Sequence, residues 1–140
     1  DLAVLGLPPY QNAVITVTFT DVGTAKCGAL VLGVTQTIGI SQYGASFGIM
    51  DYSTKTTDSS GNVTIDVGSF SDTADVDVLI ETAQFAQIKK VLTDARSVPT
   101  VWIVEPNVEG LIIYGYFREF SILMTNPTVS LTTLSIEGLN

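Results

Sequence analysis

The sequence predicts a mainly β protein of the α+β class: an antiparallel β-sandwich or partly closed barrel with one packed α-helix at about residues 82–97. Three observations support this fold class. Valine, isoleucine and threonine make up 46 of the 140 residues, and these β-branched side chains favour the pleated surface of a sheet. Apolar and polar residues alternate in several short segments, which is the period of a half-buried strand. A single segment has the spacing of an amphipathic helix.

The clearest predicted strand is Ala13–Thr20, in which apolar residues at every second position alternate with Val14 and three threonines. Glycines and turn residues divide the following segments, up to a polar hairpin tip at Ser59-Ser60-Gly61-Asn62. The further strands predicted before the helix are Cys27–Leu32, Thr35–Ile40, Phe47–Tyr52, Val63–Val67 and Asp75–Ile80. Cys27 itself, beside glycine and alanine, is predicted to be a small buried hydrophobe.

The helix prediction rests on Phe85, Ile88, Leu92 and Ala95, which recur at steps of three and four and form one apolar stripe. Thr82 is the predicted N-cap, since a threonine side chain can accept an unpaired backbone N–H of the first turn. Proline ends the helix at position 99. The stripe indicates that the helix covers one face or end of a sheet.

Four strands are predicted after the helix, with turn signals between them: Thr100–Glu105, Leu111–Phe117, Glu119–Thr125 and Val129–Ile136. Their connections are too short for a parallel crossover, so the strands are predicted to be antiparallel. Length and continuity favour a single β-rich domain over residues 1–140, and a start at Asp1 suggests an excised C-terminal part of a longer protein.

Charge and composition exclude several function classes. The chain has 14 acidic and 6 basic residues, no histidine and one cysteine. Ser-His-Asp catalysis, histidine-ligated zinc and an intramolecular disulfide are therefore impossible within it. The acidic balance argues against nucleic acid and anionic membranes, which reward a basic surface. Its longest apolar run is far shorter than a membrane-spanning helix needs, and no cofactor or metal is predicted.

Acidic residues provide two candidate chemistries. Asp72, Asp75 and Asp77 are spaced closely enough to supply calcium ligands, but the EF-hand pattern is absent and a solvated strand edge is the favoured interpretation. A pair of carboxylates can hydrolyse a glycosidic bond. The candidates for such a pair are Glu105, Glu109, Glu119 and Glu137, but no spacing singles out two of them, and the chain is predicted not to be an enzyme.

Aromatic residues are the better indication of a binding surface. A stacking platform for a sugar is one interpretation of Tyr43, Tyr52, Trp102, Tyr114, Tyr116, Phe117 and Phe120; core packing is the other, above all for Trp102. Tyr114 and Tyr116 share one face of a predicted strand. The residues predicted to contact a ligand or partner are Tyr52, Tyr114, Tyr116 and Arg118.

Several segments, in this order and at these spacings, resemble one known family. They are Leu7–Tyr10, Cys27–Leu30, Ile49–Asn62, Tyr114–Ile122, Asn126–Thr128 and Leu134–Leu139. Together they resemble the C-terminal region of tailed-bacteriophage tail proteins, which are often encoded in prophages and sometimes labelled carbohydrate-binding. The resemblance covers nearly the whole chain.

This resemblance implies a structural component of the phage tail tip or baseplate, located in the virion and engaged in assembly and host attachment. The implied partners are other tail or baseplate proteins and further copies of the chain, because virion parts assemble as symmetric oligomers. The alternative is a carbohydrate-binding module of a receptor-binding tail protein, whose partner is a glycan of the host surface. No nucleic acid and no membrane span is expected.

Overall fold

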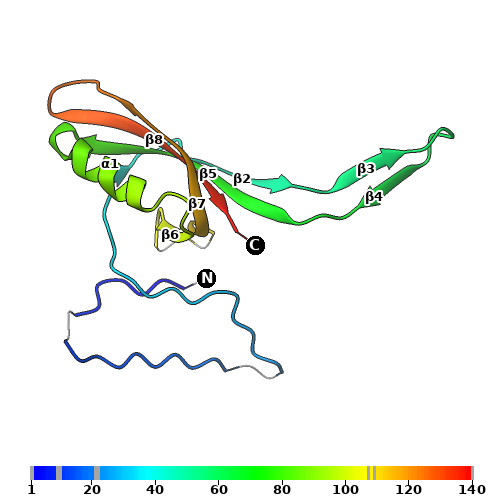
Figure 1. Cartoon of the computed structure of the whole chain (residues 1–140), viewed down its shortest axis with the longest axis horizontal. Helices are drawn as coiled ribbons and strands as arrows, with labels where there is room; N and C mark the ends of the chain where they lie inside the picture. The colour runs from blue at the N-terminus through cyan, green and yellow to red at the C-terminus, as the bar shows by residue number, and fades with distance from the viewer. Residues whose placement is uncertain (1, 9–10, 21–22, 107, 109, 140) are drawn as a thin grey trace. The chain divides into compact units, whose positions relative to one another are not determined.

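The computed structural model describes residues 2–8, 11–20, 23–106, 108 and 110–139, and the chain divides into two units. The first unit is Leu2–Gln36, and the second begins at Thr37 (Figure 1). The described residues of the first unit form no helix and no strand, and nearly all of their side chains are exposed.

The strands predicted in the first unit are therefore absent from its described residues, Ala13–Thr20 included. An alternating sequence becomes a strand only where a neighbouring strand supplies the backbone hydrogen bonds, and these residues pair with none. Cys27 is exposed, so the prediction of a buried cysteine was wrong, because no sheet forms around it.

The second unit is built on one six-stranded sheet in which every pairing is antiparallel. Its strand order is β1–β5–β8–β7–β6, and β2 also pairs with β5. The strands are β1 (Ile40–Ser41), β2 (Ser46–Asp51), β5 (Phe70–Glu81), β6 (Thr100–Ile103), β7 (Ile112–Leu123) and β8 (Val129–Gly138). The sheet curls into a half-barrel, which confirms the mainly-β prediction in its partly closed form.

The helical segment comprises a short 3-10 turn, η1 (Thr82–Gln84), and α1 (Phe85–Asp94). The predicted stripe is confirmed, because Ile88 and Leu92 are buried. The helix ends earlier than predicted, however, and Ser97 takes a left-handed backbone conformation at φ 62°. Thr82 does not cap it; its hydroxyl instead donates to the Asn126 carbonyl and contacts the Ser130 hydroxyl.

The core lies between α1 and one face of the sheet, here called the inner face. Alternate residues of the strands point into it, as the strand period requires. Its buried members are Ala74, Val76, Val78, Ile80, Ile88, Leu92, Trp102, Ile113, Leu134 and Ile136. The opposite, outer face of the sheet carries the residues between these positions, and it presents a row of polar side chains.

A β-bulge interrupts the pairing of β7 with β8. Phe117 lies opposite Ile136 and Glu119 lies opposite Ser135, so Arg118 is the extra residue. The predicted strands Leu111–Phe117 and Glu119–Thr125 are thus one continuous strand with a bulge at the residue between them.

A separate two-stranded sheet, β3 (Thr54–Thr57) and β4 (Val63–Asp66), continues from β2 and β5 and extends beyond the main sheet (Figure 1). We call residues 52–69, which include it, the arm. Its tip is the predicted polar turn, where the Asp58 side chain accepts hydrogen bonds from the backbone N–H groups of Ser60 and Asn62, each at 2.8 Å. All eight residues of β3 and β4 are exposed.

Candidate functional site

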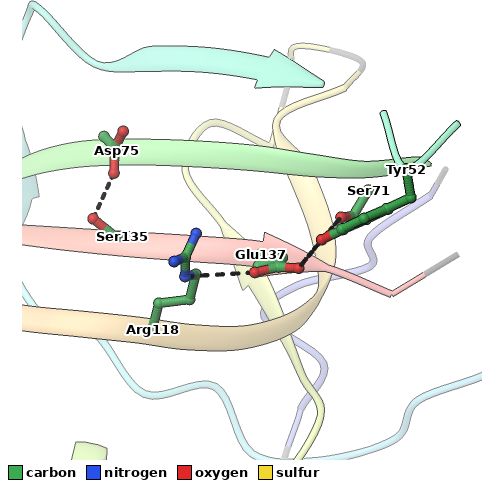
Figure 2. A network of polar contacts seen from close by, with 6 residues as sticks. All are labelled: Tyr52, Ser71, Asp75, Arg118, Ser135 and Glu137. Atoms are coloured by element: carbon green, nitrogen blue, oxygen red, sulfur yellow. Dashed lines mark hydrogen bonds and ion pairs between the residues drawn. The ribbon is translucent and has the colours of Figure 1, made fainter. Parts of the chain in front are cut away.

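The most connected polar group on the outer face is the carboxylate of Glu137, near the end of β8 (Figure 2). The Tyr52 hydroxyl donates a hydrogen bond of 2.7 Å to its Oε1. The Ser71 hydroxyl lies 3.2 Å from the Tyr52 hydroxyl and 3.4 Å from the same Oε1. On the other side, Arg118 Nε lies 3.5 Å from Oε2. We call these residues, together with Tyr116, the Glu137 cluster.

Strand register brings the cluster together. Glu137 lies opposite Tyr116 of β7 and, on its other side, opposite Thr73 of β5. The bulge places Arg118 outside the regular ladder, next to the carboxylate. Tyr52 follows the last residue of β2, and its backbone N–H donates to the carbonyl of Ser69 at 3.0 Å.

The hydrogen bonds of the cluster stabilise the ionised form of Glu137. The Tyr52 hydroxyl is the main cause that lowers the pKa of Glu137, and Tyr116, Arg118 and Ser71 lower it further, against the opposing effect of desolvation. The pKa of the Tyr116 hydroxyl is raised, first by desolvation and then by the adjacent carboxylate. At neutral pH the carboxylate is therefore a charged hydrogen-bond acceptor with only 13% of its side chain exposed.

Three of the four residues predicted to contact a ligand or partner gather at this carboxylate: Tyr52, Tyr116 and Arg118. Tyr114 lies on the same face of β7, two residues from Tyr116, and is 36% exposed. The centre of the cluster was missed, because Glu137 was considered only among the paired carboxylates and Ser71 was not considered. Glu137 could have been found from the sequence by pairing the two alternating strands, because this pairing places it opposite Tyr116.

The other candidate carboxylates lie in different surroundings. Glu105 and Glu119 are exposed, and Glu109 lies outside the described residues. The nearest partners of Glu137 are hydroxyls and a guanidinium, which hold a carboxylate ionised rather than ready to donate a proton.

The predicted acidic cluster is divided between the two faces of the sheet. Asp75 accepts a hydrogen bond of 2.5 Å from Ser135, and Asp77 accepts one of 2.8 Å from Thr133, both on the outer face. Asp72 belongs to the opposite set of β5 residues and lines an open groove of about 440 Å³ with Phe47, Ile49 and Ile113. Among the described residues, no group of three or more histidine, cysteine or acidic side chains is arranged to hold a metal ion.

The seven aromatic residues considered for a platform do not form one surface. Trp102 is buried and packs edge-on against Phe117, with ring centroids 6.0 Å apart. Its indole N–H donates to the carbonyl of Gly115 at 3.2 Å, and Phe120 also packs against the core. The core interpretation is correct for these three residues, whereas Tyr52 and Tyr114 are accessible on the surface.

Comparison with known proteins adds no family to this description: neither a protein-family model nor a curated protein matches the sequence. Within the part of the chain that the structure describes, none of the helices has the length and apolar character needed to cross a membrane.

Proposed function

We propose that this protein is a structural subunit of a bacteriophage tail tip or baseplate, which assembles in the virion with further copies of itself and with other tail proteins. The observation that carries the proposal is the arm, a two-stranded sheet with every strand residue exposed. An isolated two-stranded hairpin is at best marginally stable in water. Contact with another protein surface would supply the burial that the arm lacks.

The arm has two chemically different faces. Cross-strand pairing places Val63 opposite Thr57 and Ile65 opposite Lys55, so both apolar side chains lie on one face, and they are 61% and 54% exposed. The other face carries Thr54, Thr56, Thr64 and Asp66. An apolar stripe on an extended hairpin suits docking against a neighbouring subunit, since its burial would contribute hydrophobic free energy to assembly.

Composition supports an assembling protein as well. Charged residues make up only 14% of the chain, well below the roughly 25% of typical soluble domains. The first unit exposes large apolar side chains, among them Val14 at 92% and Phe19 at 52%. A surface with few charges and much apolar area is typical of subunits whose faces become interfaces.

The phage assignment depends on the resemblance of the sequence to tail proteins, and three of the segments that carry it contribute residues to one cluster in the second unit. Asp51-Tyr52-Ser53 lies where β2 enters the arm, and Tyr114–Ile122 forms most of β7. The closing segment Leu134–Leu139 contains Glu137. The segments that resemble the family thus supply the base of the arm and most of the Glu137 cluster.

The test is the mass of the purified protein in solution, by size-exclusion chromatography with light scattering, and negative-stain electron microscopy of the same sample. We expect oligomers for the parent chain and a shift to monomer for the double variant V63T/I65T, which keeps β-branched side chains but removes the apolar stripe. The matched control T56S/T64S changes the polar face and should assemble normally. A parent chain that stays monomeric at high concentration and is absent from purified virions would refute the proposal.

The alternative is a carbohydrate-binding module, favoured by the position of Tyr52, Tyr114 and Tyr116 on the outer face beside an ionised carboxylate and a guanidinium. Aromatic faces next to charged hydrogen-bonding groups suit a sugar ring. A glycan array separates the two functions. Binding that is lost in Tyr114→Ala, with assembly unchanged, would support the module, and no binding to any glycan would leave assembly as the function.

A further inference from the structure

The base of the arm is a joint rather than a continuous sheet. Regular pairing of β2 with β5 ends at Asp51 opposite Phe70, and pairing of β3 with β4 begins at Thr54 opposite Asp66. Between these pairs, the segments that follow β2 and precede β5 are joined by a hydrogen bond of 3.0 Å from the Tyr52 N–H to the Ser69 carbonyl. A break in the ladder allows the two sheets to change their relative direction, because few backbone hydrogen bonds resist it.

Glycine allows a close approach within this joint. A Cβ atom at Gly68 would lie 2.7 Å from the carbonyl carbon of Tyr52, a separation that only a residue without a side chain tolerates. The Gly68 N–H donates to the Ser53 hydroxyl at 3.1 Å, and that hydroxyl in turn donates to Asp51 at 2.6 Å. The joint is therefore held mainly by side-chain hydrogen bonds.

From a third strand, Glu137 contacts one side of this joint, at Tyr52, and the ladder next to it, at Ser71, which lies opposite Met50. Tyr52 follows β2, Ser71 is the second residue of β5, and each places its hydroxyl next to Oε1 of Glu137 (Figure 2). β8 is an internal strand, paired with β5 on one side and β7 on the other. The carboxylate thus has a rigid base, and Arg118 binds its other oxygen from β7.

We propose that Glu137 is the positioning residue of the arm: by binding Tyr52 at the joint and Ser71 in the adjoining part of β5, it fixes the direction in which the arm leaves the sheet to meet a neighbouring copy. This inference rests on the proposed assembly function, because a fixed direction matters only if the arm docks. Charged hydrogen bonds with little exposure are the strong ones in proteins, so the cluster suits this role better than an exposed surface pair would.

Distances between spin labels test the proposal directly. Cys27 is replaced by serine, and labels are placed at the arm tip (Ser60→Cys) and on the exposed part of β7 (Ser121→Cys), in the full chain. The cluster variants are Glu137→Gln and Tyr52→Phe, the second of which keeps the carboxylate and the aromatic ring. The matched control is Ser135→Ala, which removes the hydrogen bond to Asp75 on the same face but contacts neither chain of the joint.

We expect a single narrow distance distribution for the parent and for Ser135→Ala, and a distribution about twofold broader for both cluster variants, since few backbone hydrogen bonds cross the joint. Unchanged fluorescence of Trp102 in each variant checks that the core is intact. Distributions that stay as narrow as the parent in both cluster variants would overturn the proposal. Tyr52→Phe decides the question if Glu137→Gln fails to fold.

Oligomer mass measured on the same variants separates this inference from the function on which it rests. Broadened distributions together with weakened assembly support both. If the distributions broaden and assembly is unchanged, Glu137 positions the arm but assembly does not depend on the direction of the arm, and the proposed link between the two is refuted. If the distributions stay narrow while V63T/I65T prevents assembly, docking stands and the role of Glu137 is refuted.

Discussion

Replacement of Gly115 by alanine tests the geometry that brings Tyr116 and Glu137 together. Gly115 lies directly opposite Gly138 in the β7–β8 ladder. A Cβ atom at Gly115 would lie 2.7 Å from the Cα atom of Gly138 and closer still to the Glu137 carbonyl oxygen. These neighbours are backbone atoms of an internal strand, so they cannot rotate away as a flexible side chain would.

The size of the effect follows from this contact. Restoring the separation from Gly138 Cα from 2.7 Å to the 3.4 Å of ordinary contact takes a shift of about 0.7 Å, and the closer Glu137 carbonyl oxygen requires a larger one. Overpacking of this kind costs about 1–3 kcal/mol. The shift also disturbs adjacent hydrogen bonds, such as the one from Leu139 N–H to the Tyr114 carbonyl at 2.8 Å, each worth about 1 kcal/mol. We expect a total of about 2–4 kcal/mol and a Tm lower by about 10 °C.

Urea denaturation followed by tryptophan fluorescence measures this cost. The chain has one tryptophan, Trp102, and its indole N–H binds the carbonyl of Gly115 itself. Gly28→Ala is the control, because a Cβ atom there meets nothing within 4 Å, and Gly48→Ala, 3.2 Å from the Thr73 hydroxyl, should fall between the two. If Gly115→Ala and Gly28→Ala unfold at the same urea concentration, the close approach of β7 and β8 is wrong.

Three further predictions concern the helix, the pH and a turn. Leu92→Ala removes a buried side chain of α1 and should cost about 2–4 kcal/mol in urea unfolding; a loss below 1 kcal/mol would mean that α1 does not pack on the sheet. Since the pKa of Glu137 is lowered in the folded state, its contribution is complete above the unfolded value of about 4.3 and declines as the pH falls through the folded pKa. Glu137→Gln should flatten this part of the stability-against-pH curve, and a curve parallel to that of the parent would contradict the assignment. Asn126→Ala removes the side-chain oxygen that accepts from the backbone N–H groups of Thr128 and Val129 at 2.9 and 2.6 Å; we expect a loss of about 1 kcal/mol and faster amide exchange confined to this turn, and uniform faster exchange would argue against a local role.

Most helices and strands of the second unit could be predicted from the local sequence, because the spacing of their apolar residues matches the period of a helix or a strand. The stripe of Ile88 and Leu92 gave the helix, and the alternation from Val76 to Ile80 gave the central part of β5. The helix boundary was less accurate, because Ala95 and Arg96 are good helix formers by composition, yet α1 ends at Asp94 and the chain turns through Ser97, which has a positive φ.

Residues without long-range partners could not be predicted by the same reasoning. Ala13–Thr20 has an excellent strand pattern, but pattern does not reveal whether a neighbouring strand is present. The Glu137 cluster could not be predicted for a different reason: its residues do have partners, but these partners lie far away in the sequence. Tyr52 and Ser71 lie 85 and 66 positions away from Glu137 in the sequence, so only strand order and register bring the three together.

The bulge at Arg118 has a consequence for the reading of β7. Before it, odd-numbered residues such as Ile113 and Phe117 point to the core; after it, even-numbered ones such as Phe120 and Ile122 do. The extra residue changes which set of alternate residues, odd-numbered or even-numbered, faces the core. Removing that single amino acid would leave Phe117 opposite Ile136 and Glu119 opposite Ser135 in a regular ladder, so Phe120 and Ile122 would still face the core and the main loss would be the ion pair of Arg118 with Glu137.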